Sequence, residues 1–144
     1  MSKEKLLLDI NIVMDLLLAR QPFAEEAKKI FQKAIGREIE VYITSCSIIT
    51  IVYFMEKTVG HIKTRETLNN FLQISKTIDI KTTDIVKAFS NSDITDTEDA
   101  IQMQAAIKSG MDYILTRDTK FSAAPYPSVP IISPSQYLNN LETH

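Results

Sequence analysis

The segment Lys5-Leu6-Leu7-Leu8-Asp9-Ile10-Asn11 contains an apolar run that ends at a carboxylate. A short, continuous apolar run is typical of a strand that is buried on both faces of a parallel sheet. We therefore predict a strand over residues 5–9. A bare carboxylate in such a place costs several kcal/mol unless it is paired. Asp9 consequently needs a partner that the apolar run does not supply.

Strand-like and helix-like patterns alternate along the rest of the chain. Further strands are predicted over residues 39–43, 78–80, 113–116 and 129–132. Helices are predicted over residues 12–19, 22–35, 45–60, 64–75, 84–89, 96–108 and 134–141. This alternation indicates an α/β fold with a central, mostly parallel sheet of about four or five strands, covered by helices on both faces.

Particular residues mark the ends of the predicted helices. Ser45 is expected to cap the helix that follows the second strand. Thr95 and Glu98 form an S/T-x-x-E capping box for a later helix. Pro22 suits the first position of its helix, and Gly110 suits the position just past the end of another.

The composition is that of a globular protein. The chain has 144 residues, of which 44% are hydrophobic and 24% charged, with only 3 Gly and 5 Pro. These values exclude a disordered chain and suit one domain over residues 1–144. The net charge of −2 provides no overall positive field to recruit nucleic acid. A bound cation or local basic residues can still reverse the field at a site.

The sequence favours a cytoplasmic location. The single Cys46 cannot form an intramolecular disulfide, which suits a reducing compartment, and we predict it to be a small buried hydrophobe. The N-terminal apolar stretch is interrupted by Asp9, Asn11 and Asp15. Neither a signal peptide nor a spanning helix, which needs about 20 apolar residues, is therefore predicted.

Four aspartates are predicted to meet at one edge of the sheet. Asp9 and Asp118 stand at or just past strand ends, and parallel strands place these ends on the same edge. Asp96 and Asp99 are three residues apart at the start of a helix, so they share one of its faces. Carboxylate oxygens are preferred ligands of Mg²⁺ and Mn²⁺. The sequence therefore predicts a divalent-metal site that activates water for attack on a phosphodiester.

Several of these residues also have an explanation within the fold alone. The helix dipole explains an acid at Asp96 as well as a metal-ligand role does. Asp118, taken alone, suits a turn. Asn11 suits either the cap of the first helix or a hydrogen bond to a metal-bound water. Glu98 is assigned to the capping box, and Asp15 to the solvated or ion-paired surface of a helix.

Other polar residues are weaker candidates for the functional site. Arg117 and Lys120 flank Asp118 and are secondary candidates for contact with substrate phosphates. His61 and His144 lack the spacing of metal ligands. The sequence has no nucleophile-elbow motif, Walker A loop or dinucleotide-binding glycine motif. Hydrolysis by a metal-activated water requires none of them.

Three short segments resemble the PIN-domain family. They are Leu8-Asp9-Ile10-Asn11, Asp96-Thr97-Glu98-Asp99-Ala100 and Leu115-Thr116-Arg117-Asp118, in this order and on matching elements. The resemblance covers essentially the whole chain and implies a three-layer α/β/α sandwich. It also implies an RNA-binding, Mg²⁺- or Mn²⁺-dependent ribonuclease, a hydrolase that is often the toxin of a bacterial toxin–antitoxin pair.

The resemblance further implies roles for individual residues and partners. Asp9, Asp99 and Asp118 would be the catalytic, metal-binding acids. Asp96 would be an auxiliary metal ligand, and Asn11 a site-shaping residue. A homodimer and an antitoxin protein are the partners that the family suggests, besides the RNA substrate.

The chain departs from the family pattern at one position. The family usually has a Glu early in the helix after the second strand, where this chain has Thr50-Ile51-Val52. Glu56 lies about one and a half turns further along and is predicted to point elsewhere. Loss of one carboxylate should weaken metal affinity, or make the site depend on Asp96 for the missing charge.

Three classes of function are compatible with these residues. The first is a metal-dependent endoribonuclease. The second is a catalytically decayed PIN-like module that binds RNA or protein, which the missing Glu favours. The third is phosphoryl transfer, since Asp9-Ile10-Asn11-Ile12-Val13 loosely resembles the nucleophile loop of haloacid-dehalogenase-like phosphatases, but Asn11 replaces the expected second Asp. A receiver domain is disfavoured because its acid pair at the first strand is not evident.

Overall fold

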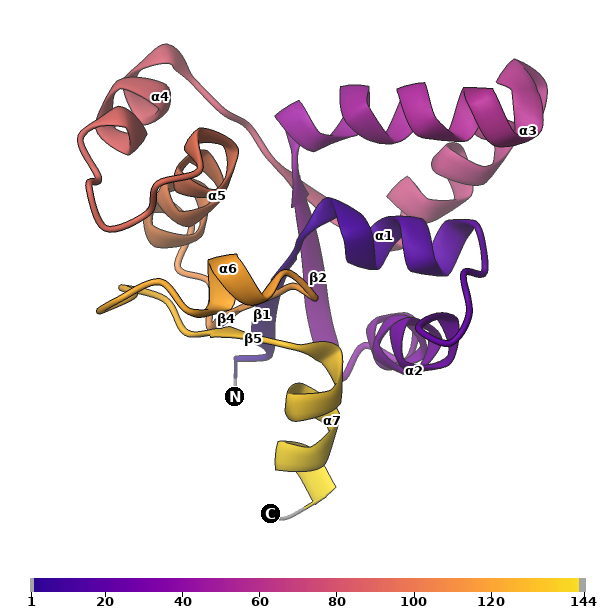
Figure 1. Ribbon diagram of the computed structural model, residues 1–144. Helices are drawn as coiled ribbons and strands as arrows, with labels where there is room; N and C mark the ends of the chain where they lie inside the picture. The colour runs from indigo at the N-terminus through magenta and orange to yellow at the C-terminus, as the bar shows by residue number, and fades with distance from the viewer. Residues whose placement is uncertain (1, 143–144) are drawn as a thin grey trace.

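Figure 1 shows the computed structural model, which describes residues 2–142. At its centre lies a 5-stranded, entirely parallel sheet in the order β3-β2-β1-β4-β5. The strands are β1 (Glu4–Leu8), β2 (Ile39–Thr44), β3 (Lys76–Ile78), β4 (Tyr113–Leu115) and β5 (Ile131–Ile132). The predicted α/β fold is confirmed, although β3 begins and ends two residues earlier than predicted and β5 is shorter.

Helices cover both faces of this sheet. They are α1 (Ile10–Leu17), α2 (Ala24–Ile35), α3 (Ser45–Ile74), α4 (Thr82–Phe89), α5 (Thr97–Lys108), α6 (Thr119–Ser122) and α7 (Pro134–Glu142). Helices α1, α2 and α3 lie on one side of the sheet, and α4 and α5 lie on the other (Figure 1). This arrangement is the three-layer sandwich that the family resemblance implies.

The alternation of side chains along β1 directs them into two cores. Leu6 and Leu8 pack in the cluster that includes residues of α1, α2 and α3. Leu7 points the other way and packs in the cluster formed with α4 and α5. All three leucines are 3% exposed or less. The apolar run is thus continuous because both faces of β1 are covered.

The strand order reverses at β1. From β1 the chain adds β2 and β3 on one side, and it later adds β4 and β5 on the other. Ligands of open α/β sheets bind at such a point, beyond the carboxyl ends of the strands. Asp9 directly follows β1, and its N–H donates to the Leu115 carbonyl at 3.0 Å, so the ends of β1 and β4 stay together.

Several helix starts differ from the prediction. Thr44 rather than Ser45 caps α3, because Thr44 Oγ1 accepts a hydrogen bond from the Ser47 N–H at 3.1 Å. Ser45 Oγ instead accepts from the Ile80 N–H. Helix α2 begins at Ala24, two residues after Pro22.

The cap of α5 also differs, with a consequence for the site. Asp96 is its N-cap, and Asp96 Oδ1 accepts the hydrogen bond from the Asp99 N–H at 3.0 Å. The predicted capping box of Thr95 and Glu98 is therefore wrong. Asp96 takes the capping role, and Glu98 instead lines a pocket at the start of α5.

Two glycines adopt backbone conformations that other residues rarely reach. Gly60 has φ 82° and ψ 170° and divides α3 into the two helices that the sequence predicts as separate. Gly110 has φ 66°, and bonds from Gly110 N–H to Ile107 O and from Met111 N–H to Ala106 O close a Schellman motif. The predicted end of α5 is confirmed.

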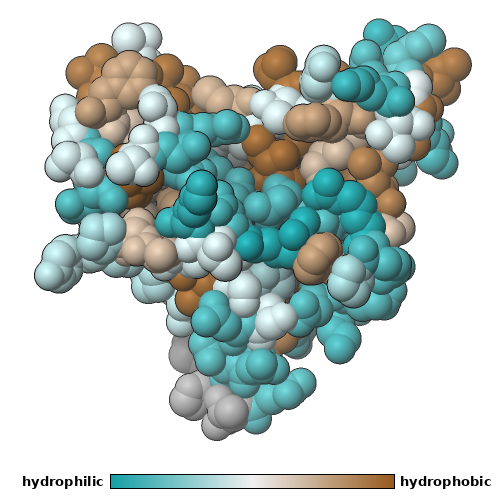
Figure 2. Space-filling view, viewed as in Figure 1, coloured by the Kyte–Doolittle hydropathy of each residue, from teal (hydrophilic) through white to brown (hydrophobic). Residues whose placement is uncertain are grey.

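The surface shows where charged and apolar residues gather. In Figure 2, apolar residues lie over α4 and along α3, and a hydrophilic band crosses the middle of the face. Cys46 is exposed, so its predicted burial is wrong. Within residues 2–142, no helix is long and apolar enough to cross a membrane. His144 lies outside the described residues.

Candidate active site

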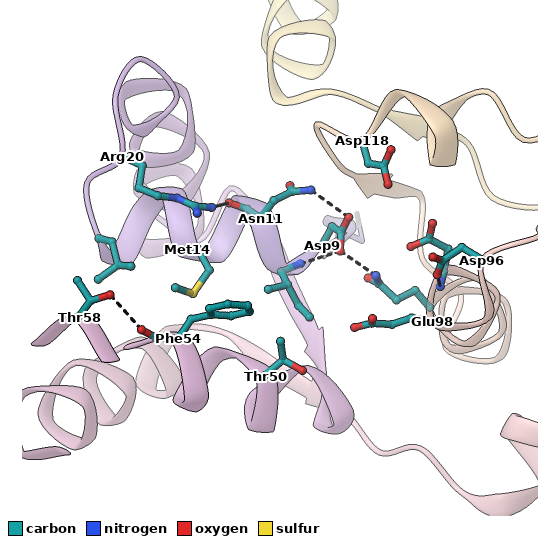
Figure 3. Close-up of a pocket in the computed structure, with 14 residues that line it drawn as sticks. Asp9, Asn11, Met14, Arg20, Thr50, Phe54, Thr58, Asp96, Glu98 and Asp118 are labelled. Carbon is teal, nitrogen blue, oxygen red and sulfur yellow. Dashed lines mark hydrogen bonds between the residues drawn. The ribbon is translucent and has the colours of Figure 1, made fainter. Parts of the chain in front are cut away.

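A pocket of about 670 Å³ opens beyond the carboxyl end of β1 (Figure 3). Side chains from α1, the first half of α3, the start of α5 and the loop after β4 line it. Its acidic members are Asp9, Asp96, Glu98, Asp99 and Asp118. The structure thus brings the four predicted aspartates to one pocket and adds Glu98.

Asp9 is the most constrained of these acids. It is 8% exposed, and it is the N-cap of α1, where Oδ1 accepts from the Ile10 N–H at 2.8 Å. Thr116 Oγ1 donates to Oδ2 at 2.7 Å, and Asn11 Nδ2 donates to the same oxygen at 3.2 Å. The partner that Asp9 requires is therefore a set of hydrogen-bond donors. Asn11 does not cap α1 and instead holds Asp9.

Gln102 completes this set and is missed by the sequence prediction. Its Nε2 donates to Asp9 Oδ1 at 2.8 Å, across 93 residues of sequence, and the side chain is 3% exposed. Within the described residues, its Oε1 is buried and has no hydrogen-bond partner. Gln102 follows Asp99 by three residues on α5, so its presence on the helix face of Asp99 is the signal that sequence reading offers.

The start of α5 concentrates negative charge. Partial burial, together with Asp96, Asp9, Asp118 and Glu98, raises the pKa of Asp99 to about 7. Partial burial and the charges of Asp9 and Asp96 also raise the pKa of Glu98 above its ordinary value. These carboxylates therefore stand close enough to disfavour one another's ionised form.

Asp118 enters the pocket from the loop that follows β4. It caps the short helix α6, since Asp118 Oδ1 accepts from the Lys120 N–H at 2.9 Å. Its own N–H donates to Thr116 Oγ1 at 3.0 Å, the same hydroxyl that holds Asp9. The turn role and the place at the pocket thus coexist in one residue. Lys120 and Asp118 together line a smaller cavity next to the pocket.

No ion pair among the described residues compensates this cluster, although Arg20, which pairs with Asp15, also lines the pocket. Among residues 2–142, the ion pairs of Lys and Arg involve none of the five acids of the pocket. Oxygen-rich, uncompensated sites suit hard cations such as Mg²⁺ and Mn²⁺, which hold carboxylates and retained waters. The donor chemistry therefore fits a divalent metal.

The side-chain arrangement is less complete than the donor chemistry. Among the described residues, no group of three His, Cys, Asp or Glu is placed to hold a metal ion. Both oxygens of Asp9 already accept two hydrogen bonds each. Binding a metal in this pocket therefore requires carboxylates to turn toward it.

Asp15 is not on the surface as predicted. It is 1% exposed and ion-paired with Arg20 at 3.0 Å and Arg117 at 2.6 Å. The prediction of a solvated position is wrong, whereas ion pairing is confirmed. The Arg117 guanidinium also lies 3.7 Å from the centroid of the Phe23 ring. Arg117 is thus engaged by protein groups, and Lys120 remains exposed.

Comparisons with known proteins agree with this architecture. The family model described as PIN domain matches residues 5–120. The chain therefore belongs to the PIN-domain family. No curated protein matches the chain in sequence.

Solved structures share the fold at low sequence identity. VapC20 of Mycobacterium tuberculosis, a toxin that cleaves the sarcin-ricin loop, has a TM-score of 0.67 at 15% identity, over 87% of this chain and 98% of its own. VapBC2 of Rickettsia felis, bound to a DNA fragment of its promoter, has a TM-score of 0.68 at 16% identity, over 88% and 96%. A toxin–antitoxin complex of Klebsiella pneumoniae has a TM-score of 0.65 at 23% identity, over 89% of this chain and 96% of its own.

The departure from the family pattern can now be placed in the structure. Thr50, in the stretch that matches the usual Glu of the family, lines the pocket on α3. Glu56 is exposed and does not line the pocket. In Figure 3, Glu98 lies across the pocket from Thr50 and extends its carboxylate into the space between Thr50 and Asp9. A carboxylate from α5 thus occupies the side of the pocket where α3 supplies none.

Proposed function

We propose that the protein is a divalent-metal-dependent endoribonuclease. The observation that carries this proposal is the cluster of five carboxylates in one pocket without a Lys or Arg partner among residues 2–142. Asp9, Asp96 and Asp118 each cap a helix, but bringing five acids together has a cost, because like charges disfavour one another's ionised form. A bound Mg²⁺ or Mn²⁺ supplies the missing positive charge and lowers the pKa of a bound water.

The residues of the chain divide the work in this proposal. Asp9, Asp99 and Asp118 would hold the metal, with Asp96 as an auxiliary ligand. Gln102, Asn11 and Thr116 hold the Asp9 carboxylate in place, since all three donate hydrogen bonds to it. Such outer partners orient a ligand and typically change affinity or activity by about 10–100-fold.

We further propose that Glu98 replaces the Glu that the family usually has on α3. Its carboxylate reaches the pocket from α5, opposite Thr50, as Figure 3 shows. Partial burial, and after it the nearby charges of Asp9 and Asp96, raises its pKa, as expected of an acid that shares a site with other acids. This role restores the negative charge that the substitution at Thr50 removes.

A toxin role in a toxin–antitoxin pair is part of the same proposal. It is supported by the similarity in fold to VapC20, a toxin, and to the VapBC2 and Klebsiella pneumoniae toxin–antitoxin assemblies. We expect an antitoxin protein to bind this chain and the chain itself to form a homodimer. Expression in bacteria should stop growth, and co-expression of the gene next to it should restore growth.

The decisive experiment is RNA cleavage by the purified protein with Mn²⁺, Mg²⁺ or EDTA. We expect cleavage only with metal, and a loss of more than about 100-fold in Asp99→Asn, beyond the loss typical of outer partners. Asp79→Asn is the matched control, because Asp79 is exposed and lines none of the pocket. Intact RNA at every metal concentration would rule out the enzyme.

The alternative function is a PIN-like module without catalysis that binds RNA or protein. It is favoured by the saturation of Asp9 with four hydrogen-bond donors and by the absence, among residues 2–142, of three acids placed to hold a metal. Thermal unfolding with increasing Mn²⁺ separates the two functions. Metal that binds the folded state raises the melting temperature, whereas a decayed site leaves it unchanged.

A further inference from the structure

The buried ion pair between Asp15 on α1 and Arg117 before α6 connects the core to the pocket. Arg117 Nε donates to Asp15 Oδ2 at 2.6 Å, and Arg117 Nη2 donates to Asp15 Oδ1 at 3.0 Å. This bidentate geometry fixes the orientation of a guanidinium as well as its position. Asp15 is only 1% exposed, and burying a charge to this degree is costly unless well-oriented partners and hydrogen bonds offset the lost hydration.

Arg117 stands next to Asp118 in the chain, so whatever fixes its side chain also restrains that loop. The Arg117 N–H donates to Asn11 Oδ1 at 3.3 Å, which ties the loop to α1 a second time. The Phe23 ring centroid lies 3.7 Å from the guanidinium and adds a cation–π contact. Asp15, Asn11 and Phe23 together hold Arg117 from the core side of the loop.

The hydrogen bonds around Arg117 continue to two acids of the pocket, Asp9 and Asp118. Asn11 Nδ2 donates to Asp9 Oδ2, and Thr116 Oγ1 links the Asp118 N–H to Asp9. A continuous path of hydrogen bonds therefore joins buried Asp15 to two acids of the pocket. Arg20 also pairs with Asp15, but its other bond goes to the Asn11 carbonyl and not to the loop.

We propose that Asp15 is a positioning residue that acts through Arg117 to hold the loop between β4 and α6, and with it the Asp118 carboxylate, at the acidic pocket. The consequence for catalysis rests on the proposed function, whereas the restraint on the loop does not. Arg117 is thereby a structural clamp and not a contact for substrate phosphate.

The first test is amide hydrogen exchange of the metal-free, full-length protein. We expect Arg117→Met to speed exchange at the Asp118 and Lys120 amides by at least about tenfold, because their hydrogen bonds depend on the loop, without an equal change in α5. Lys108→Met is the matched control. It removes the cationic partner of another buried aspartate, Asp84, which is 6% exposed, at a place that does not line the pocket.

The second test is the Mn²⁺ concentration that gives half of the maximal thermal stabilisation. We expect Arg117→Met to raise it about 10–100-fold, as loss of an outer partner does, and Lys108→Met to leave it within about twofold. In RNA cleavage, the loss should fall on kcat, with KM little changed. A role confined to stability predicts instead that both variants lower the melting temperature and change neither exchange at Asp118 nor the Mn²⁺ midpoint.

Asp15→Asn distinguishes a clamp from a phosphate contact. If Asp15 acts through Arg117, this variant resembles Arg117→Met. If Arg117 binds phosphate, releasing it should leave kcat unchanged and lower KM.

Should Asp15→Asn fail to fold, Arg117→Lys is the second variant, because Lys retains the charge without the bidentate geometry. We expect it to show the same faster exchange in the loop, in weaker form. Unchanged exchange at Asp118 in Arg117→Met overturns the proposal, even if the wild type cleaves RNA. An inactive wild type with the expected exchange rejects only the nuclease.

Discussion

A single carboxylate lies near one end of α1 and a cluster of five lies at the other, and the two differ in how their charge is balanced. Asp15, near the C-terminal end, is 1% exposed and paired with Arg20 and Arg117. Around Asp9, at the N-terminal end, five acids share a pocket, and among residues 2–142 no Lys or Arg pairs with them.

The difference separates a carboxylate whose charge is balanced by ion pairs from a cluster of acids without such pairs among residues 2–142. Removing one partner of a buried ion pair leaves an uncompensated charge, so loss of the Asp15 pairs should destabilise the fold. Partial burial, and after it the charges of the neighbouring acids, raises the pKa of Asp99 in the pocket. Substituting Asp15 should therefore destabilise the fold, whereas a neutral residue at Asp99 should relieve the cost of its partial burial and of the neighbouring charges.

The largest expected effect is on stability at the compensated end. Asp15→Ala should lower the free energy of unfolding by about 3 kcal/mol, at the low end for a broken buried pair, because Arg20 and Arg117 are 43% and 28% exposed and keep some hydration. Urea denaturation measures this loss. Lys28→Ala, which breaks a surface pair with Glu25, should cost less than about 0.5 kcal/mol. Equal losses in both variants would remove the distinction.

An intermediate effect is expected at Glu98, the acid that we propose replaces the missing family Glu. Glu98→Gln should reduce metal-dependent RNA cleavage about tenfold, within the range for residues that support a metal site, and leave the fold intact. Cleavage rates at saturating Mn²⁺ measure the effect, with Glu56→Gln as the control because Glu56 lies outside the pocket. Identical cleavage rates in the two variants would contradict a role for Glu98 in the metal site.

The smallest effect is the pH dependence of the metal-free protein. Since the pKa of Asp99 is raised from 3.8 to about 7, the folded state binds this proton more tightly than the unfolded chain does. The resulting stabilisation is complete below about pH 3.8 and is lost as the pH rises through about 7. In EDTA, the melting temperature of the wild type should therefore fall relative to Asp99→Asn by a few degrees over this range. A difference that stays constant with pH contradicts the raised pKa of Asp99.

Much of this molecule follows from short stretches of its sequence. The apolar run before Asp9 predicts a buried strand, and the alternation of patterns predicts the parallel sheet, because burial of each element depends on its own side-chain period. Errors concentrate at helix starts. Thr44 and Ser45 are neighbours that can both cap, as are Thr95 and Asp96, and only the backbone geometry selects between them.

The order of the elements and the convergence of Asp9, Asp96, Asp99 and Asp118 were thus determined by the sequence alone, since parallel strands align their carboxyl ends. The tertiary structure decided what surrounds them. Gln102 reaches Asp9 across 93 residues, and Arg117 reaches Asp15 across 102. No local pattern encodes such pairs, because they form only when α1 packs beside the end of β4 and α5 points its first turn at the pocket.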